Sequence, residues 1–276
     1  MTQGTPWLAL RRATPARISL GRSGNALPTA AQLDFQLAHA RARDAVHAAL
    51  DAERIAAELE GLGLTALRLR SMASERAAYL RRPDLGRRLD QTSRDLLIRH
   101  SGEGRNLGIG RPSGGNLAPG LRRDDDDKRV CDIAFVVADG LSATAVNAHA
   151  VPLIAAMFSL YGEEQPQVAP VAVVEGGRVA IGDEIGGLLD ADLVAVLIGE
   201  RPGLSAADSL GVYLTWAPAP GAVDAARNCL SNIRPEGMPI PEAAAALVRL
   251  IAAACQHRMT GIALSQRLPR QIAGAL

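Results

Sequence analysis

The chain has 276 residues, of which 48% are hydrophobic, 21% are charged and only 3% are aromatic, and its formal net charge is +1. This composition is typical of a globular protein with a sizeable aliphatic core, and it excludes global disorder. The balanced charge favours neither nucleic acid nor an anionic membrane, and the scarcity of aromatic residues argues against a surface that stacks single-stranded bases.

Three cysteines, Cys131, Cys229 and Cys255, occur without a C-x-x-C pair. An odd number in this pattern predicts reduced thiols in a reducing compartment. No apolar segment reaches the roughly 20 residues that span a bilayer, and the first residues lack the charged and apolar regions of a signal peptide. We therefore expect a cytoplasmic protein without a membrane segment.

Residues 1–100 predict an N-terminal, largely helical segment that begins with an irregular arm at residues 1–16. Apolar residues recur at helical spacing, Thr29 is an acceptable N-cap, and Pro83 occupies a good first-turn position. The elements expected here are helices over about 29–50 and 51–59, a strand over 64–69, and a helix from Pro83 to about Arg99.

Residues 101–129 differ in kind from the rest of the chain, because they are rich in Gly, Pro, Ser and Asn and contain almost no core residues. Such a composition predicts a flexible linker or insertion. A glycine-rich stretch at 102–108 superficially resembles a dinucleotide fingerprint, but its spacing is wrong by one residue and no strand precedes it. We therefore assign no ligand to this segment.

Residues 130–276 alternate buried strands with helices. The elements expected are strands over 133–138, 168–174, 193–198 and 210–216, a helix around 146–160, and helices over 183–189 and 241–257. Continuous apolar runs such as 133–138 are typical of strands covered on both faces. The sequence thus predicts an α/β fold with a Rossmann-like, doubly wound, mostly parallel sheet.

Three unusual stretches lie at or next to the ends of apolar runs: G-G-R-V at Gly176–Val179, I-G-E-R-P-G-L at Ile198–Leu204 and R-N-C-L-S-N-I at Arg227–Ile233. In open α/β sheets, ligands bind at the carboxyl ends of strands. Glu200 and Arg201 directly follow a buried strand, so they could either contact a ligand or form an ion pair that closes the loop.

The usual catalytic patterns are absent. The sequence contains no G-x-S-x-G nucleophile elbow, no H-E-x-x-H metal pair and no Walker A stretch. Cys229 could be read as a nucleophile, but a free cysteine is more often a small buried hydrophobe. We therefore predict no catalytic residue and no metal ligand on this chain, and we interpret the three stretches as a binding surface.

Several ordered motifs carry a family resemblance. They are L-G-R-S-G-N-A-L-P-T (Leu20–Thr29), Y-L-R-R-P-D-L-G-R-R-L (Tyr79–Leu89), V-A-D-G-L-S (Val137–Ser142), G-R-V-A-I-G-D-E-I-G (Gly177–Gly186), L-I-G-E-R-P-G-L (Leu197–Leu204) and C-L-S-N-I (Cys229–Ile233). With these motifs the sequence resembles the light chain (small subunit) of adenosylcobalamin-dependent ethanolamine ammonia-lyase along most of its length. Any one motif alone would be weak, whereas so many in the same order are specific.

The resemblance implies a lyase complex that converts ethanolamine into acetaldehyde and ammonia by radical chemistry. It implies a separate large (heavy) subunit that carries the substrate site and the catalytic residues, and a hetero-oligomer of several heterodimers. Adenosylcobalamin would lie between the two chains. The family also implies a cytoplasmic location, with encapsulation in a bacterial microcompartment.

Position by position, the resemblance places the family's cobalamin contacts on Val179, Glu200 and Cys229. It implies packing from Val179 and Cys229, and a hydrogen bond from Glu200 to the corrin amides or the nucleotide tail. Asp139–Ser142 is a second candidate near the tail.

Two alternatives stay open from the sequence. The sheet pattern alone is also typical of a stand-alone Rossmann-like enzyme that binds a nucleotide or a sugar, although the glycine fingerprint of such enzymes is missing. The chain could also be a purely structural partner subunit, with Glu200 and Arg201 at the interface.

Overall fold

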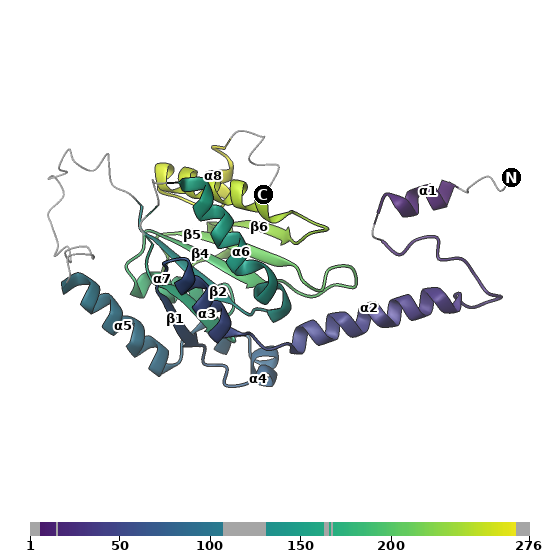
Figure 1. Cartoon of the computed structure of the whole chain (residues 1–276), viewed down its shortest axis with the longest axis horizontal. Coiled ribbons are helices and arrows are strands. Elements are labelled where there is room, and N and C mark those ends of the chain that lie inside the picture. The colour runs from purple at the N-terminus through teal and green to yellow at the C-terminus, as the bar shows by residue number, and fades with distance from the viewer. Residues whose placement is uncertain (1–5, 15, 107–130, 163–165, 167, 269–276) are drawn as a thin grey trace.

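The computed structural model describes residues 6–14, 16–106, 131–162, 166 and 168–268, and a six-stranded sheet forms its centre (Figure 1). The strands lie in the order β1-β3-β2-β4-β5-β6. Their bounds are Ala66–Arg70 (β1), Ile133–Ala138 (β2), Val171–Glu175 (β3), Leu193–Gly199 (β4), Leu210–Trp216 (β5) and Arg227–Ile233 (β6). The predicted linker at 101–129 lies outside the described residues, apart from 101–106.

The sheet is mixed. β1, β3, β2 and β4 run parallel to their neighbours, whereas β5 is antiparallel to β4 and β6 is antiparallel to β5. The predicted α/β class is confirmed, but the Rossmann-like, doubly wound parallel sheet is not. The connections after β4 and β5 explain the difference: residues 200–209 and 217–226 are too few for the crossover of a dozen or more residues that a parallel return needs.

Helices cover both faces of the parallel strands. On one face, Phe135 and Val137 of β2 belong to an apolar cluster with three helices. On the other face, Val136 packs with Leu97 and Ile185 from two more helices. This double burial explains the continuous apolar run of β2. The helices on the first face are α3 (Ala52–Gly61), α6 (Ala143–Tyr161) and α8 (Ile240–His257), and those on the second face are α5 (Gln91–Asn106) and α7 (Ile181–Leu188).

The helix predicted to start at Pro83 starts later. A short helix, α4 (Arg76–Arg81), and a 3-10 turn at Leu85–Arg87 come first, and α5 begins at Gln91. Asp90 Oδ1 accepts a hydrogen bond from the Ser93 backbone N–H at 2.8 Å, which satisfies one of the free donors of the first turn. An aspartate in this position is a stronger helix start than the proline on which the prediction relied.

The N-terminal arm extends away from the sheet. It holds α1 (Pro6–Arg12), within the stretch predicted to be irregular, and α2 (Thr29–His47). Figure 1 shows α2 running outward from the body, and only Ala38 and Ala45 of this helix are buried. Nearer the sheet, β1 and α3 belong to the common core. The domain boundaries at residues 100 and 130 stay a prediction.

By length and composition alone, α6 could cross a membrane, which corrects the expectation that no segment is long and apolar enough. Half of its apolar stretch is buried inside the protein. Leu153, Ile154 and Met157 pack in the same cluster as β2 and α8. A core helix of a globular protein passes the same length and composition test, and this burial is what such a helix shows.

Two of the three cysteines form a disulfide, which corrects the expectation of reduced thiols. Cys131 just precedes β2 and Cys255 lies in the last turns of α8, and their Cα atoms are 5.8 Å apart. The packing of α8 across the sheet brings together residues that are 124 positions apart in sequence, so their spacing could not reveal the pair. Cys229 is free. The cytoplasmic location stays a prediction.

Candidate functional site

The three predicted cofactor residues lie on three different elements. Val179 is in the loop between β3 and α7, Glu200 directly follows β4, and Cys229 lies within β6. Glu200 accepts a hydrogen bond from Ser231, two residues after Cys229 on β6, so the structure brings Glu200 and Cys229 to the same region. Val179 packs against the apolar cluster beneath α7, and Tyr213 of β5 packs against the same cluster.

Glu200 is fixed by its own chain. Its Oε1 accepts a hydrogen bond from the Ser231 hydroxyl at 2.6 Å, and its Oε2 accepts from the Asn232 backbone N–H at 3.1 Å and from the Ser209 hydroxyl. Gly211 leaves room for this carboxylate, because a Cβ there would lie 3.1 Å from Oε1. The carboxylate is therefore held rigidly over the start of β5, next to β6.

The Glu200–Arg201 ion pair that the sequence left open is not found among the described residues, where Glu200 instead binds Ser209, Ser231 and Asn232. Arg201 is exposed. The charge of Glu200 thus fastens the loop after β4 to β6.

Tyr213 is a functional candidate that sequence reasoning missed. It lies opposite Cys229 in the β5–β6 pairing, and both side chains are half-buried. Burial raises the pKa of the Tyr213 phenol, and the neighbouring Cys229 and Glu200 raise it further. A signal was available in the sequence: Tyr213 alternates with the buried Val212 and Leu214, so it must face the opposite side of the strand.

The Cys229 thiol is held in its neutral form. Burial raises its pKa, the hydrogen bond with Tyr213 lowers it, and the negative charge of Glu200 raises it again. A thiol needs a lowered pKa to act as a nucleophile near neutral pH. The neutral Cys229 thiol is suited to an apolar contact, which is the role that the resemblance implied for it, and it also retains a weak hydrogen-bond donor.

A buried ion pair fixes α7 beside this surface. The Arg227 guanidinium at the start of β6 makes two 2.6 Å contacts with the Asp183 carboxylate of α7, and it also donates to Thr215 at 2.8 Å. Arg227 is 8% exposed and Asp183 is 1% exposed. Gly182 allows the close approach, because a Cβ there would overlap Val196 of β4. Sequence reasoning missed this pair.

Asp139, the second candidate from the sequence, supports the loop that carries Val179. Its Oδ1 accepts a hydrogen bond from the Gly177 backbone N–H at 3.0 Å, and its Oδ2 lies 3.3 Å from Arg76 Nη1. Burial raises the pKa of Asp139 to about 6, although Arg76 opposes the shift. Ser142 caps α6 and donates to a loop carbonyl. Both side chains are thus engaged within the protein.

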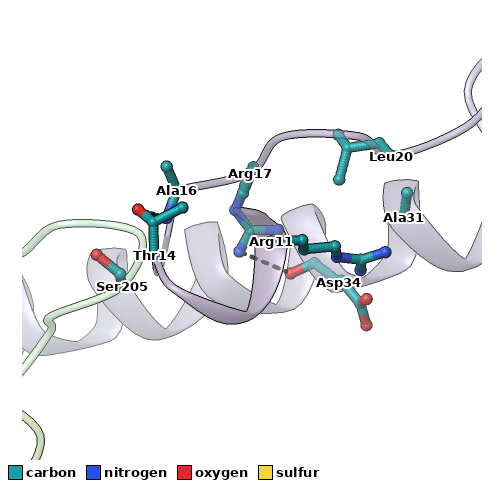
Figure 2. A pocket seen from close by; sticks show the side chains of 8 residues that line it. All are labelled: Arg11, Thr14, Ala16, Arg17, Leu20, Ala31, Asp34 and Ser205. Carbon is teal, nitrogen blue, oxygen red and sulfur yellow. Dashed lines mark hydrogen bonds between the residues drawn. The ribbon is translucent and has the colours of Figure 1, made fainter. Parts of the chain in front are cut away.

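A hollow of about 260 Å³ lies between the N-terminal arm and the loop after β4 (Figure 2). Arg17 of the arm donates to the Asp34 carbonyl of α2 at 3.4 Å, and Ser205 comes from the loop between β4 and β5. None of the three predicted cofactor residues lines this hollow.

The β5–β6 part of the sheet leaves one face partly open. Leu210, Val212 and Leu230 pack beneath α6 and α8 on the covered face. On the other face, α7 covers Thr215 and Arg227 through Asp183, whereas Tyr213 and Cys229, further along the same strands, are half-buried. The same described residues hold no cluster of His, Cys, Asp and Glu that could bind a metal ion. The arrangement is a shallow, polar binding surface beside α7.

The comparison with known proteins decides the family. A model of the ethanolamine ammonia-lyase light chain matches residues 4–265. The chain belongs to the ethanolamine ammonia-lyase light-chain family. The ethanolamine ammonia-lyase small subunit of Pseudomonas syringae pv. tomato is 49% identical over 263 residues, covering 94% of this chain and 82% of the relative.

Two further relatives carry the same description. The ethanolamine ammonia-lyase small subunit of Pseudomonas putida strain W619 is 48% identical, over 95% of this chain and 88% of the relative. That of Bradyrhizobium diazoefficiens is 46% identical, over 98% of this chain and 96% of the relative. The resemblance that the sequence motifs indicated is therefore confirmed for nearly the whole light chain.

Proposed function

We propose that this chain is the cobalamin-binding small subunit of an adenosylcobalamin-dependent ethanolamine ammonia-lyase. The cofactor lies at the interface with the large subunit, and the complex converts ethanolamine into acetaldehyde and ammonia. Family membership supports the enzyme assignment. The open face of β5 and β6 carries the proposal for this chain, because Cys229 is half-buried there and Glu200 binds Ser231, two residues further along β6.

The residues of this surface fit a cobalamin. A corrin ring is broad, and its rim carries carboxamide side chains, which need both hydrogen-bond donors and acceptors. The open face offers the Glu200 carboxylate as an acceptor and the Cys229 thiol and Tyr213 hydroxyl as donors, and Val179 in the loop before α7 is the expected apolar contact. Gly211 has no side chain, so the Glu200 carboxylate can lie close to β5. The Cys229 thiol stays neutral and does not compete for cobalt as a thiolate.

The chain's own residues bind and orient the cofactor and exclude water from one side of it. Radical chemistry is what adenosylcobalamin supplies when bound, and binding and orientation are what the protein adds. Val179 packs, Glu200 accepts a hydrogen bond, and Cys229 donates one. The catalytic residues belong to the large subunit.

The assembly follows from the same proposal. A surface that covers one side of a cofactor requires a partner for the other side, and the partner is the large subunit of ethanolamine ammonia-lyase. Several such heterodimers form the hetero-oligomer. The protein is cytoplasmic and is enclosed in a bacterial microcompartment.

Reconstitution tests this function. The chain and the large subunit from the same organism are purified separately, mixed with adenosylcobalamin, and assayed for acetaldehyde released from ethanolamine. We expect activity only when both chains are present. Full activity of the large subunit alone would contradict the proposal. Turnover or tight nucleotide binding by this chain alone would favour a stand-alone enzyme.

A further inference from the structure

Tyr79 lies in a cluster that joins the N-terminal segment to the loop between β3 and α7 (residues 176–180). Tyr79 is 1% exposed. The Arg76 guanidinium, from α4, lies 4.6 Å from the centroid of its ring, and the Arg178 guanidinium, from the loop, lies 4.4 Å from it. Contacts between a cation and an aromatic ring are strongest where water is excluded. The buried ring therefore connects an arginine of α4 to an arginine of the loop.

Hydrogen bonds fix the loop to the same cluster. The Arg178 backbone N–H donates to the Gly86 carbonyl at 2.8 Å, and Arg178 Nη2 donates to the Tyr79 carbonyl at 3.0 Å. The Gly177 backbone N–H donates to Asp139 Oδ1 at 3.0 Å. The Tyr79 hydroxyl lies 3.3 Å from the Gly177 carbonyl, which is long for a hydrogen bond between two oxygens. Two successive backbone N–H groups of the loop are thus held by groups outside it.

Arg76 anchors the cluster to two further parts of the chain. Its Nε donates to the Val46 carbonyl in the last turn of α2 at 2.7 Å, and its Nη1 donates to the Gly140 carbonyl after β2 at 2.8 Å. Arg76 Nη2 and Arg178 Nε are buried, and among the described residues they have no hydrogen-bond partner. The Tyr79 ring is therefore the contact that stabilises both guanidinium groups.

The 3-10 turn at Leu85–Arg87 packs closely against the loop. A Cβ at Gly86 would lie 2.9 Å from the Gly176 carbonyl oxygen and 3.1 Å from the Tyr79 ring. Both Tyr79 and Gly86 belong to the sequence motif Y-L-R-R-P-D-L-G-R-R-L, for which the proposed function gives no role. These two residues of the motif contact the loop that carries Val179.

From this geometry we propose that Tyr79 and Arg178 are cofactor-positioning residues, which hold the 176–180 loop so that Val179 packs against the cofactor. A loop that is fixed before the cofactor binds loses less conformational entropy on binding. Both side chains act through the loop and not by touching the cofactor. This role rests on the proposed function and deepens it, because it makes the N-terminal segment responsible for the shape of a cofactor-binding loop.

The first test measures the order of the loop itself. Hydrogen–deuterium exchange of the full chain is followed by mass spectrometry over the peptide that contains Gly177 and Arg178. Arg178→Lys keeps the positive charge but removes the planar group that lies over the ring and bonds to the Tyr79 carbonyl. We expect the amides of this peptide to exchange about tenfold faster in the variant, because their opening is no longer opposed by the cluster.

Arg82→Lys is the matched control for this substitution. Arg82 directly follows α4, is exposed, and donates to Asp84 at 2.7 Å. The control should leave the exchange of the 176–180 loop as it is in the wild type. Equal exchange of the loop in Arg178→Lys and in the wild type would show that the cluster does not hold the loop, and would overturn the inference.

The second test measures cofactor affinity. Cyanocobalamin is titrated into the complex with the large subunit, and its dissociation constant is followed by absorbance. Arg178→Lys should weaken binding about tenfold, because part of the binding free energy is then spent on ordering the loop. Tyr79→Phe keeps the ring and loses only the long hydroxyl contact, so it should bind within about twofold of the wild type. A tenfold loss in Tyr79→Phe with none in Arg178→Lys would contradict the role of the ring contacts.

Kinetics separate positioning from a purely structural role. The concentration of adenosylcobalamin that gives half the maximal rate should rise about tenfold in Arg178→Lys, while the rate at saturating cofactor stays within about twofold of the wild type. Gel filtration measures how much complex assembles. Less assembled complex with an unchanged affinity for the cofactor would show that the cluster only stabilises the fold, and would overturn the inference.

The two failures can be told apart. If the wild-type complex binds no cyanocobalamin, the proposed function is wrong and the cofactor role of the cluster falls with it, while hydrogen exchange still shows whether the cluster holds the loop. If the wild type binds, and Arg178→Lys loosens the loop without weakening binding, the positioning role alone is wrong.

Discussion

The parallel and antiparallel halves of the sheet differ in what covers them. β2 and β4 lie between two layers of helices, and every residue of both strands is buried. β5 and β6 are fully covered on one face, whereas on the other α7 covers Thr215 and Arg227 and leaves Tyr213 and Cys229 half-buried. The covered half stabilises the fold, and the partly open half is the part that we propose receives a cofactor and a partner chain.

The largest expected effect is on stability, and it comes from breaking the buried ion pair between α7 and β6. Asp183→Ala leaves the Arg227 guanidinium buried without its carboxylate, and breaking a buried pair in this way costs about 3–5 kcal/mol. We expect urea unfolding to show a loss of this size. Asp224→Ala is the control, because Asp224 is fully exposed and lies 3.7 Å from the same guanidinium. Equal losses in both variants would mean that the buried pair is not what joins α7 to β6.

A smaller, pH-dependent effect on the free energy of unfolding is expected from Asp139, which directly follows β2 in the covered half. Burial raises the pKa of Asp139 from its ordinary value of 3.8 to about 6, so the folded protein favours the protonated carboxyl group more than the unfolded chain does. Stability from this group is fully present below about pH 4 and is lost as the pH rises through 6. Two pKa units correspond to about 3 kcal/mol.

Asp139→Asn removes this titration. We expect the free energy of unfolding of the wild type to fall relative to that of the variant between pH 4 and 7, by at most about 3 kcal/mol. Urea unfolding of both proteins across this range measures the difference. A difference that does not change with pH would show that Asp139 does not titrate in this window.

The sequence predicted all the described strands except β6, and it placed β5 at its observed residues. Continuous apolar runs placed β2 at its observed residues and β4 to within one residue, because burial on both faces leaves a strong pattern. β6 was missed as a strand, since R-N-C-L-S-N-I mixes buried and exposed residues. Its polar side chains were nevertheless noticed as unusual, which is how Cys229 became a candidate.

Long-range pairing is the part that the sequence could not supply. The Cys131–Cys255 disulfide, the Arg227–Asp183 pair and the Ser231–Glu200 hydrogen bond all join different parts of the chain. No local spacing encodes such contacts, because they depend on how helices and strands pack. Glu200 was singled out by its position after a buried strand and assigned to the cofactor by the resemblance, and the structure adds the three donors that fix its carboxylate.

The central claim is that the open face of β5 and β6 is covered by a cofactor and a partner chain, and labelling of Cys229 tests it most directly. Cys229 is the free cysteine, and the disulfide-bonded Cys131 and Cys255 serve as unreactive references. Iodoacetamide labelling, quantified by mass spectrometry, is compared for the isolated chain and for its complex with the large subunit, with and without cobalamin. We predict at least tenfold slower labelling in the complex with cobalamin. Equal rates in all three states would contradict the claim.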